Sequence, residues 1–242
     1  LEIDDTLAEA HTCLGGLHLY YDWDRPRAAS ELKRAIELSP SCASAHELYA
    51  LCLELMGRPD EAMAEAERAQ ELDPLSPVIC ADVGIRHYCA RRYDQAIKQY
   101  HQVLEMAPAF LLAHHFLWIA YERKGMYDAA VGECQKLLSL SGYPEGGAAL
   151  AEVYARLGYR AAMQEQLKKM KELSARRPSL SWDIAGIYTF LGDTERAFDW
   201  LEKAYQDRNS LLPWTKLDPR FDPLRSDPRL QDLLRRMNFG VR

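Results

Sequence analysis

The feature that most constrains the fold is an internal repeat of about 34 residues. Glycine recurs at one position of the repeat, at intervals of 68, 33 and 34 residues, and Arg91 fills the slot halfway along the longest interval. Those glycines are Gly57, Gly125, Gly158 and Gly192. Alanine follows five positions later in most units, and Pro40, Pro74 and Pro108 close three successive units. A period of this length predicts stacked copies of one supersecondary unit.

Each unit has the pattern of two amphipathic helices joined by a turn. In ASAHELYALCLELMG (43–57) and PDEAMAEAERAQELDP (59–74), apolar residues recur at helical spacing, and Gly57 and Pro59 interrupt the pattern between them. A single helix pair cannot bury its apolar faces alone, so neighbouring pairs must pack against one another. The sequence therefore predicts an all-α chain.

These repeated positions resemble the tetratricopeptide repeat over nearly the whole chain. The resemblance implies a right-handed superhelical solenoid of about six helix–turn–helix units, within residues 1–210, followed by a C-terminal capping segment at 211–242. The expected units are 8–41, 43–75, 77–109, 111–143, 144–177 and 178–210.

Some stretches depart from the repeat. YYDWDRPRAA (20–29) holds one residue more than the first unit allows. SGYPEGG (141–147) contains three glycines and fits either a hinge between units four and five or an ordinary loop. LEIDD (1–5) resembles the end of a repeat, which predicts an earlier unit before it.

Three histidines occupy the fourth position of a first helix: His11, His46 and His114, with Cys80 at that position in the third unit. They could be metal ligands or packing residues repeated with the fold. Packed helices are roughly 8–10 Å apart, whereas zinc needs ligand atoms about 2 Å from one centre. Because equivalent positions form a row along the stack, we predict packing residues, no metal site and no cofactor.

Enzyme motifs for phosphate binding, dinucleotide binding or a nucleophilic serine do not occur in the sequence. Asp183, beside Trp182, has no second carboxylate near it in the sequence. An unrecognised enzyme would need an acid–base or nucleophile cluster, and the sequence supplies none. We therefore predict a protein that is not an enzyme, with no catalytic residue.

Charge and composition restrict the partners and the location. A formal net charge of −6 argues against a general nucleic-acid binder. No apolar run approaches 18 residues, so we expect no membrane span. The chain shows no signal peptide, and its six cysteines include no C-x-x-C pair, which favours a reducing cytoplasm.

The resemblance also predicts where a partner would bind. In the family, contacts come mostly from positions 2, 5, 9, 12 and 13 of the first helices, which line the concave side. Here these positions form an apolar and aromatic strip with a few charges, suited to an amphipathic helix or an extended segment. The candidate partner-binding residues are Tyr20, Leu51, Ile85, Tyr88, His115, Ile119, Glu122, Arg123, Trp182 and Phe190.

Other interpretations of this strip stay open. Every first helix also packs between two neighbours, so any of these residues can instead belong to the core; we single out Tyr88, Ile119, Glu122 and Arg123 as partner contacts. A small-molecule sensor, with Tyr88, His115 and Trp182 as lining, is the alternative function. Chaperone-binding members hold a peptide carboxylate with Lys at position 5 and Asn at position 9. No unit here has either residue, so we expect no such clamp.

The carboxyl end, LDPRFDPLRSDPRLQDLLRRM (217–237), has three Asp-Pro steps, each of which can open a short helix. After Asp227, one apolar stripe predicts a capping helix. The stripe consists of Leu230, Leu233, Leu234 and Met237. Three arginines on the other face are either a solvated surface or a basic surface for nucleic acid.

This ending and LHLYYDWDRPRAASELKRAIELSP (17–40) resemble the C-terminal array of certain bacterial regulators. In that group the array follows a winged-helix, serine/threonine kinase or class III adenylate cyclase domain. The resemblance implies a scaffold that binds a protein or peptide partner and forms the regulatory arm of a bacterial signalling protein.

Overall fold

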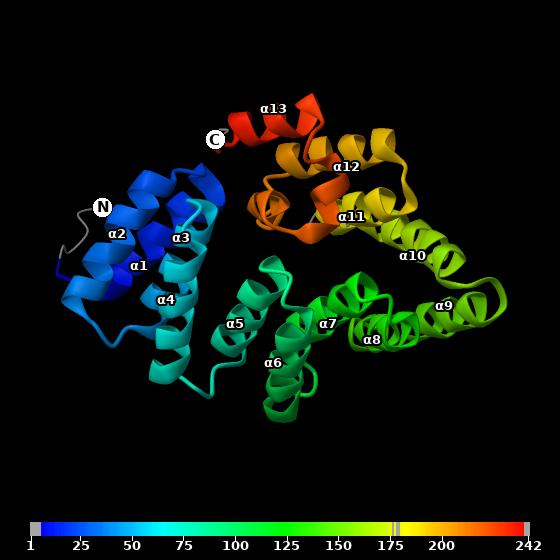
Figure 1. Ribbon diagram of the computed structural model, residues 1–242, viewed down its shortest axis with the longest axis horizontal. Helices are drawn as coiled ribbons and strands as arrows, with labels where there is room; N and C mark the ends of the chain where they lie inside the picture. Colours follow the sequence, from blue (N-terminus) through cyan, green and yellow to red (C-terminus); the bar gives the residue numbers. More distant parts are fainter. Residues whose placement is uncertain (1–5, 176, 178–179, 240–242) are drawn as a thin grey trace. The chain divides into compact units, whose positions relative to one another are not determined.

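The computed structural model describes residues 6–175, 177 and 180–239. Helices make up most of these residues and no strand occurs among them (Figure 1), so the expected all-α repeat fold is confirmed. The chain forms two compact units, Leu1–Phe110 and Leu111–Arg242, here called the amino-terminal and carboxy-terminal units. LEIDD, the expected end of an earlier repeat, lies outside the described residues.

The amino-terminal unit consists, in its described part, of three helix pairs. Each first helix packs against its own second helix and against the neighbouring pair. The repeated alanines of the second helices, among them Ala62 and Ala96, have no exposed surface. The pairs are α1 (Ala8–Leu17) with α2 (Arg25–Leu38), α3 (Ala43–Leu55) with α4 (Pro59–Leu72), and α5 (Pro77–Cys89) with α6 (Tyr93–Met106).

The carboxy-terminal unit has three more pairs within its described residues, followed by a terminal segment of short helices. The pairs are α7 (Leu111–Arg123) with α8 (Tyr127–Leu140), α9 (Pro144–Leu157) with α10 (Tyr159–Ser174), and α11 (Ser181–Leu191) with α12 (Thr194–Gln206). The terminal segment contains the 3₁₀-helices η3 (Leu212–Lys216) and η4 (Pro219–Leu224) and the α-helix α13 (Pro228–Arg236). In Figure 1, α13 lies along α12, which it contacts.

The glycines of the repeat end the first helix of their pairs with a left-handed residue. Gly57, Gly125, Gly158 and Gly192 have φ of 80°, 71°, 81° and 76°. Arg91, which fills the same slot in the third pair, has φ of 61°. This conformation is easy for glycine and unfavourable for a residue with a Cβ atom, which explains the recurrence of glycine at this slot.

The extra residue expected in the first unit is absorbed as a π-helix. Residues His18–Asp22 form η1, which continues α1, and Trp23 follows in the left-handed conformation. A π-helical turn holds one more residue than an α-helical turn. The connection between the helices of this pair therefore gains a residue without disturbing the packing of the pair.

The glycine-rich junction at 141–147 is a short connection. α8 ends at Leu140, α9 begins at Pro144, and the two helices pack against each other. The division between the two compact units falls after Phe110, not at this junction.

Two of the three Asp-Pro steps open a helix as expected. Asp218 caps η4 and Asp227 caps α13, each by accepting a hydrogen bond from a backbone N–H. The expectation is wrong for Asp222, because Pro223 lies inside η4. The apolar stripe of α13 is buried, with Leu230 and Met237 fully covered.

Candidate functional site

The three repeated histidines are joined to glutamates of their own helix pairs. Each Nδ1 atom lies 2.5–2.6 Å from a carboxylate oxygen of the second helix. The pairs are His11–Glu31, His46–Glu65 and His114–Glu133. Their sequence spacing is 20 residues in the first pair and 19 in the others, and the difference is the residue absorbed by η1.

The third repeat replaces both members of this pair. Cys80 stands where the histidine would be, and Gln99 stands where the glutamate would be. The Gln99 side-chain amide donates to the backbone oxygen of Cys80 over 3.0 Å. Each polar pair therefore joins the two helices of one repeat, and the described residues include no group of three metal-ligating side chains.

The inner face of each unit, meaning the surface formed by its first helices, carries the residues expected to contact a partner. Of the ten, Arg123 is exposed and Tyr20, His115 and Phe190 are partly exposed. The other six are buried: Leu51, Ile85, Tyr88, Ile119, Glu122 and Trp182. Tyr88 and Ile119 have no exposed surface. Contact of any of the ten residues with a partner stays a prediction. The four that have exposed surface are Tyr20, His115, Arg123 and Phe190.

In the amino-terminal unit, an arginine lies at the centre of a buried charge cluster. Arg86 is 2% exposed, and its guanidinium bonds both carboxylate oxygens of Asp82 over 2.6 and 3.2 Å. It also donates to Glu54 of α3, which ties two first helices together. Burial raises the pKa of Glu54 and the facing arginine opposes that rise. The positive charge of Arg86 is therefore compensated by Asp82 and Glu54 within the fold.

Two groups beside this cluster remain available. Glu47 of α3 is partly exposed, and burial together with the nearby Asp82 raises the pKa of its carboxyl to about 7. Tyr20 of η1 lies near Glu47, and burial and that carboxylate raise the pKa of its hydroxyl. Burial is the larger cause of this rise in the Glu47 pKa, and Arg86 opposes it only in part.

In the carboxy-terminal unit, the terminal segment covers the inner face of α11. Arg220 of η4 is 4% exposed and lies with its guanidinium 4.4 Å from the ring centre of Trp182. The same guanidinium bonds Asp183 over 3.2 Å and Asp218 over 3.0 Å. Phe221 also packs on Trp182, with ring centres 5.7 Å apart. Trp182, one of the ten candidates, is therefore covered by the chain itself.

Polar groups of α7 belong to the same buried region. The Nε2 atom of His115 lies 3.5 Å from Asp183 and is buried without a hydrogen bond. Burial lowers the pKa of His115. Glu122 accepts a hydrogen bond of 2.7 Å from Tyr159, and burial raises the pKa of its carboxyl. The polar cluster around Arg220 thus contains neutral as well as charged groups.

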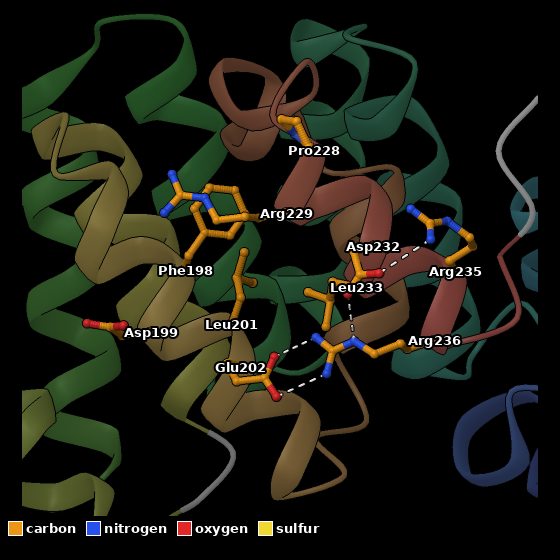
Figure 2. Close-up of a pocket in the computed structure, with 10 residues that line it drawn as sticks. All are labelled: Phe198, Asp199, Leu201, Glu202, Pro228, Arg229, Asp232, Leu233, Arg235 and Arg236. Carbon is orange, nitrogen blue, oxygen red and sulfur yellow. Dashed lines mark hydrogen bonds and ion pairs between the residues drawn. The ribbon is translucent and has the colours of Figure 1, made fainter.

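The terminal segment also forms a pocket of about 580 Å³ between α12 and α13. Figure 2 shows Leu201 and Leu233 between the two helices and Arg236 bonded to both Glu202 and Asp232. Arg229 stacks on Phe198 with its guanidinium 4.2 Å from the ring centre. Most of the charged side chains that line this pocket are paired with acids or bases of α12 and α13.

The arginines of α13 form ion pairs with acids of α12 and α13. Arg229 pairs with Glu195 over 2.9 Å, Arg236 with Glu202 over 2.5 Å, and Arg235 with Asp232 over 3.4 Å.

In the part of the chain that the structure describes, no helix is both long and apolar enough to cross a membrane.

The sequence did not identify Arg220, Arg86 or Glu47 as important groups of the inner faces. One sequence feature could have pointed to the two arginines. Asp82 and Asp183 each directly follow the position-5 residue of their first helix. The arginine that binds Asp183 lies 37 residues away, beyond the reach of helical periodicity.

Comparisons with known proteins agree with this geometry. The tetratricopeptide-repeat family matches residues 13–77 and 84–146. The Hsp70-Hsp90 organizing protein 1 of Glycine max is 28% identical over 93 residues, which are 38% of this chain and 16% of that protein. The chain thus spans about a sixth of the length of this relative.

Solved structures show the same fold. The TTC0263 protein of Thermus thermophilus is similar with a TM-score of 0.59 and 17% identity, over 82% of this chain and 99% of that one. The APC/C hetero-tetramer Cut9-Hcn1 gives a TM-score of 0.58 and 19% identity, over 96% of this chain and 43% of that one. With its family match over more than half of its length, the chain belongs to the tetratricopeptide-repeat family of helical interaction scaffolds.

Proposed function

We propose that the chain is a non-enzymatic scaffold that binds a peptide or helix of a partner protein on the inner face of its amino-terminal unit. The observation that carries this proposal is the pair of Glu47 and Tyr20, which are partly exposed beside the Arg86 cluster. The inner face of α11, by contrast, is covered by η4. The charge of the amino-terminal unit indicates which kind of partner segment it would bind.

Charge favours a cationic partner segment. Residues 1–110 hold ten Lys/Arg and nineteen Asp/Glu, a formal charge of −9, whereas residues 111–242 hold twenty and seventeen. A negative surface steers a cationic segment toward itself and raises the association rate. An ammonium or guanidinium beside Glu47 would offset the negative charge of Asp82 and favour the ionised Glu47 carboxylate.

The position of Glu47 supports the same conclusion. Glu47 stands at position 5 of its repeat, where chaperone-binding relatives carry the lysine that holds a peptide carboxylate. The opposite charge at that position reverses the preference, from a carboxylate to a cation. We also propose that this scaffold acts in signalling, as the arm that recruits the partner, a role that the resemblance to bacterial regulators supports.

A displayed peptide library tests this function on the full chain. We expect the selected peptides to be rich in Lys and Arg, and Glu47→Lys to weaken their binding at least tenfold. Glu61→Lys is the matched control, because Glu61 is an exposed glutamate on α4 of the same unit. Selection of no peptide, or of peptides that bind the Glu47→Lys chain equally well, would refute the proposal.

A further inference from the structure

The inner face of α11 is built to receive a guanidinium group. Its three components are the indole face of Trp182, the carboxylate of Asp183 and the missing side chain of Gly186. A Cβ atom on residue 186 would lie 3.0 Å from Nη1 and 3.3 Å from Cζ of Arg220. A Cβ atom there would be in tight contact with the guanidinium, and glycine avoids that contact. Stacking on an aromatic ring combined with an ion pair is a binding mode suited to arginine rather than lysine.

Two of these residues stand at positions that contact partners in the family. Trp182 is at position 5 and Gly186 at position 9 of the last first helix. Arg220 and Phe221 therefore occupy the place that a partner segment would take on this repeat. This part of the terminal segment therefore lies on the α11 surface as an intramolecular ligand would.

Residues 211–227, the part of the terminal segment before α13, are attached to the fold at both ends independently of Arg220. Before them, α12 packs on α11; after them, α13 is held on α12 by the Arg229–Glu195 and Arg236–Glu202 ion pairs. These contacts do not involve residues 211–227, so displacement of that stretch would not break them directly. Arg225 holds the segment in its own shape by donating to the backbone oxygens of Thr215, Lys216 and Asp218.

The anchoring contacts combine a buried ion cluster with buried apolar side chains of the same segment. Asp183, Asp218 and Arg220 are buried together, and the desolvation of buried ions offsets much of their attraction. Such a contact contributes more to specificity than to net stability. The buried apolar side chains of the segment are Leu212, Trp214, Phe221 and Leu224. Phe221 packs on Trp182 beside Arg220, so a competing segment needs an aromatic residue next to its arginine.

We propose that the inner face of α11 is an exchangeable binding site for an arginine–aromatic segment, with residues 211–227 as its resident intramolecular ligand. A partner that presents arginine followed by an aromatic residue displaces this segment and binds Trp182 and Asp183. The site is separate from the surface of Glu47 and Tyr20, so its failure leaves the proposed function of that surface untouched.

A synthetic peptide of residues 214–227, WTKLDPRFDPLRSD, tests this site on the full chain. In the Arg220→Ala/Phe221→Ala chain the resident ligand is weakened, and we expect the labelled peptide to bind at least tenfold more tightly than to the unaltered chain. Adding Asp183→Asn to that chain, or replacing the arginine that corresponds to Arg220 in the peptide by alanine, should each reduce binding at least tenfold. Equal binding of both peptides, or no binding to a folded double variant, would overturn the proposal.

A second measurement covers the case in which the double variant does not fold. In the unaltered chain, amide hydrogen exchange should be at least tenfold faster in residues 211–227 than in α11 and α13, because the segment opens locally. If residues 211–227 and α11 exchange at one common rate, the segment opens only with its repeat and is no exchangeable ligand.

Discussion

Asp82 in α5 and Asp183 in α11 occupy the same position of their repeats, and each carboxylate binds a buried arginine. For Asp82 the arginine is Arg86, one turn further along the same helix. The corresponding residue after Asp183 is Ile187, and Arg220 of the terminal segment takes the role instead. In the third repeat the arginine belongs to the same helix as the aspartate, whereas in the last repeat the terminal segment supplies it.

Removing the cation of the last repeat should destabilise the carboxy-terminal unit. Arg220→Ala leaves Asp183 and Asp218 buried without their counter-charge, and we expect a loss of about 3 kcal/mol in the free energy of unfolding. Urea unfolding measures it. Arg156→Ala is the control, because Arg156 and its partner Glu152 are 72% and 70% exposed, and should change stability by about 0.5 kcal/mol or less. Equal effects of the two substitutions would contradict the role of Arg220.

Two helix glycines predict opposite effects of the same substitution. A Cβ atom on Gly84 would lie 2.5 Å from the ring of Tyr100, which has no exposed surface, so Gly84→Ala should destabilise the chain by about 1–3 kcal/mol. Gly132 lies inside α8 with nothing within 4 Å of its Cβ position, so Gly132→Ala should stabilise it by about 0.5–1 kcal/mol. Thermal unfolding of both variants checks the signs. A neutral or stabilising Gly84→Ala would mean that Tyr100 can move aside.

The repeat made most of the fold predictable from the sequence. Its period marked the turns, because a left-handed turn residue is needed once per pair and glycine recurs at that slot. The extra residue in YYDWDRPRAA was predictable too, although its conversion into a π-helix was not. Counting residues reveals an insertion, but the packing of the pair decides where it is absorbed.

The inner faces were less predictable, because helical position alone does not decide between partner contact and core. Ile119 and Arg123 stand on the same side of α7, one turn apart, yet the first has no exposed surface and the second is exposed. The covering of Trp182 by η4 depends on a long-range contact that no local pattern records. The recurrence of Asp82 and Asp183 at one position of the repeat is visible in the sequence, but the arginines that they bind come from different elements.

The raised pKa of Glu47 makes the stability of the amino-terminal unit depend on pH. Its carboxyl has a pKa of about 7 in the folded chain, mainly because of burial and then because of Asp82, against about 4.3 when unfolded. The folded state therefore binds the proton more tightly, and its contribution to stability is present below about pH 4 and is lost as the pH rises through 7.

Glu47→Gln removes this dependence. At pH 8 the substituted chain should be more stable than the unaltered chain by about 1–2 kcal/mol, a figure reduced for the partial exposure of the side chain, and at pH 4 the two should be nearly equal. Urea unfolding at the two pH values measures the difference, with Glu61→Gln as the control on exposed α4 surface. A difference that is the same at pH 4 and pH 8 would show that Glu47 does not titrate in this range.

The histidine–glutamate pairs predict a coupling that the third repeat lacks. His46 and Glu65 are in contact over 2.5 Å between α3 and α4, so a double-mutant cycle with alanine at both positions should give a coupling energy of about 1 kcal/mol. Cys80 and Gln99 hold the same two positions one repeat later, but the Gln99 amide bonds only the backbone oxygen of Cys80. The cycle of Cys80→Ala and Gln99→Ala should therefore show a coupling near zero, because the backbone acceptor survives the first substitution. If both cycles give the same coupling, the polar pair does not join the helices of the second repeat, and its recurrence in the sequence has another cause.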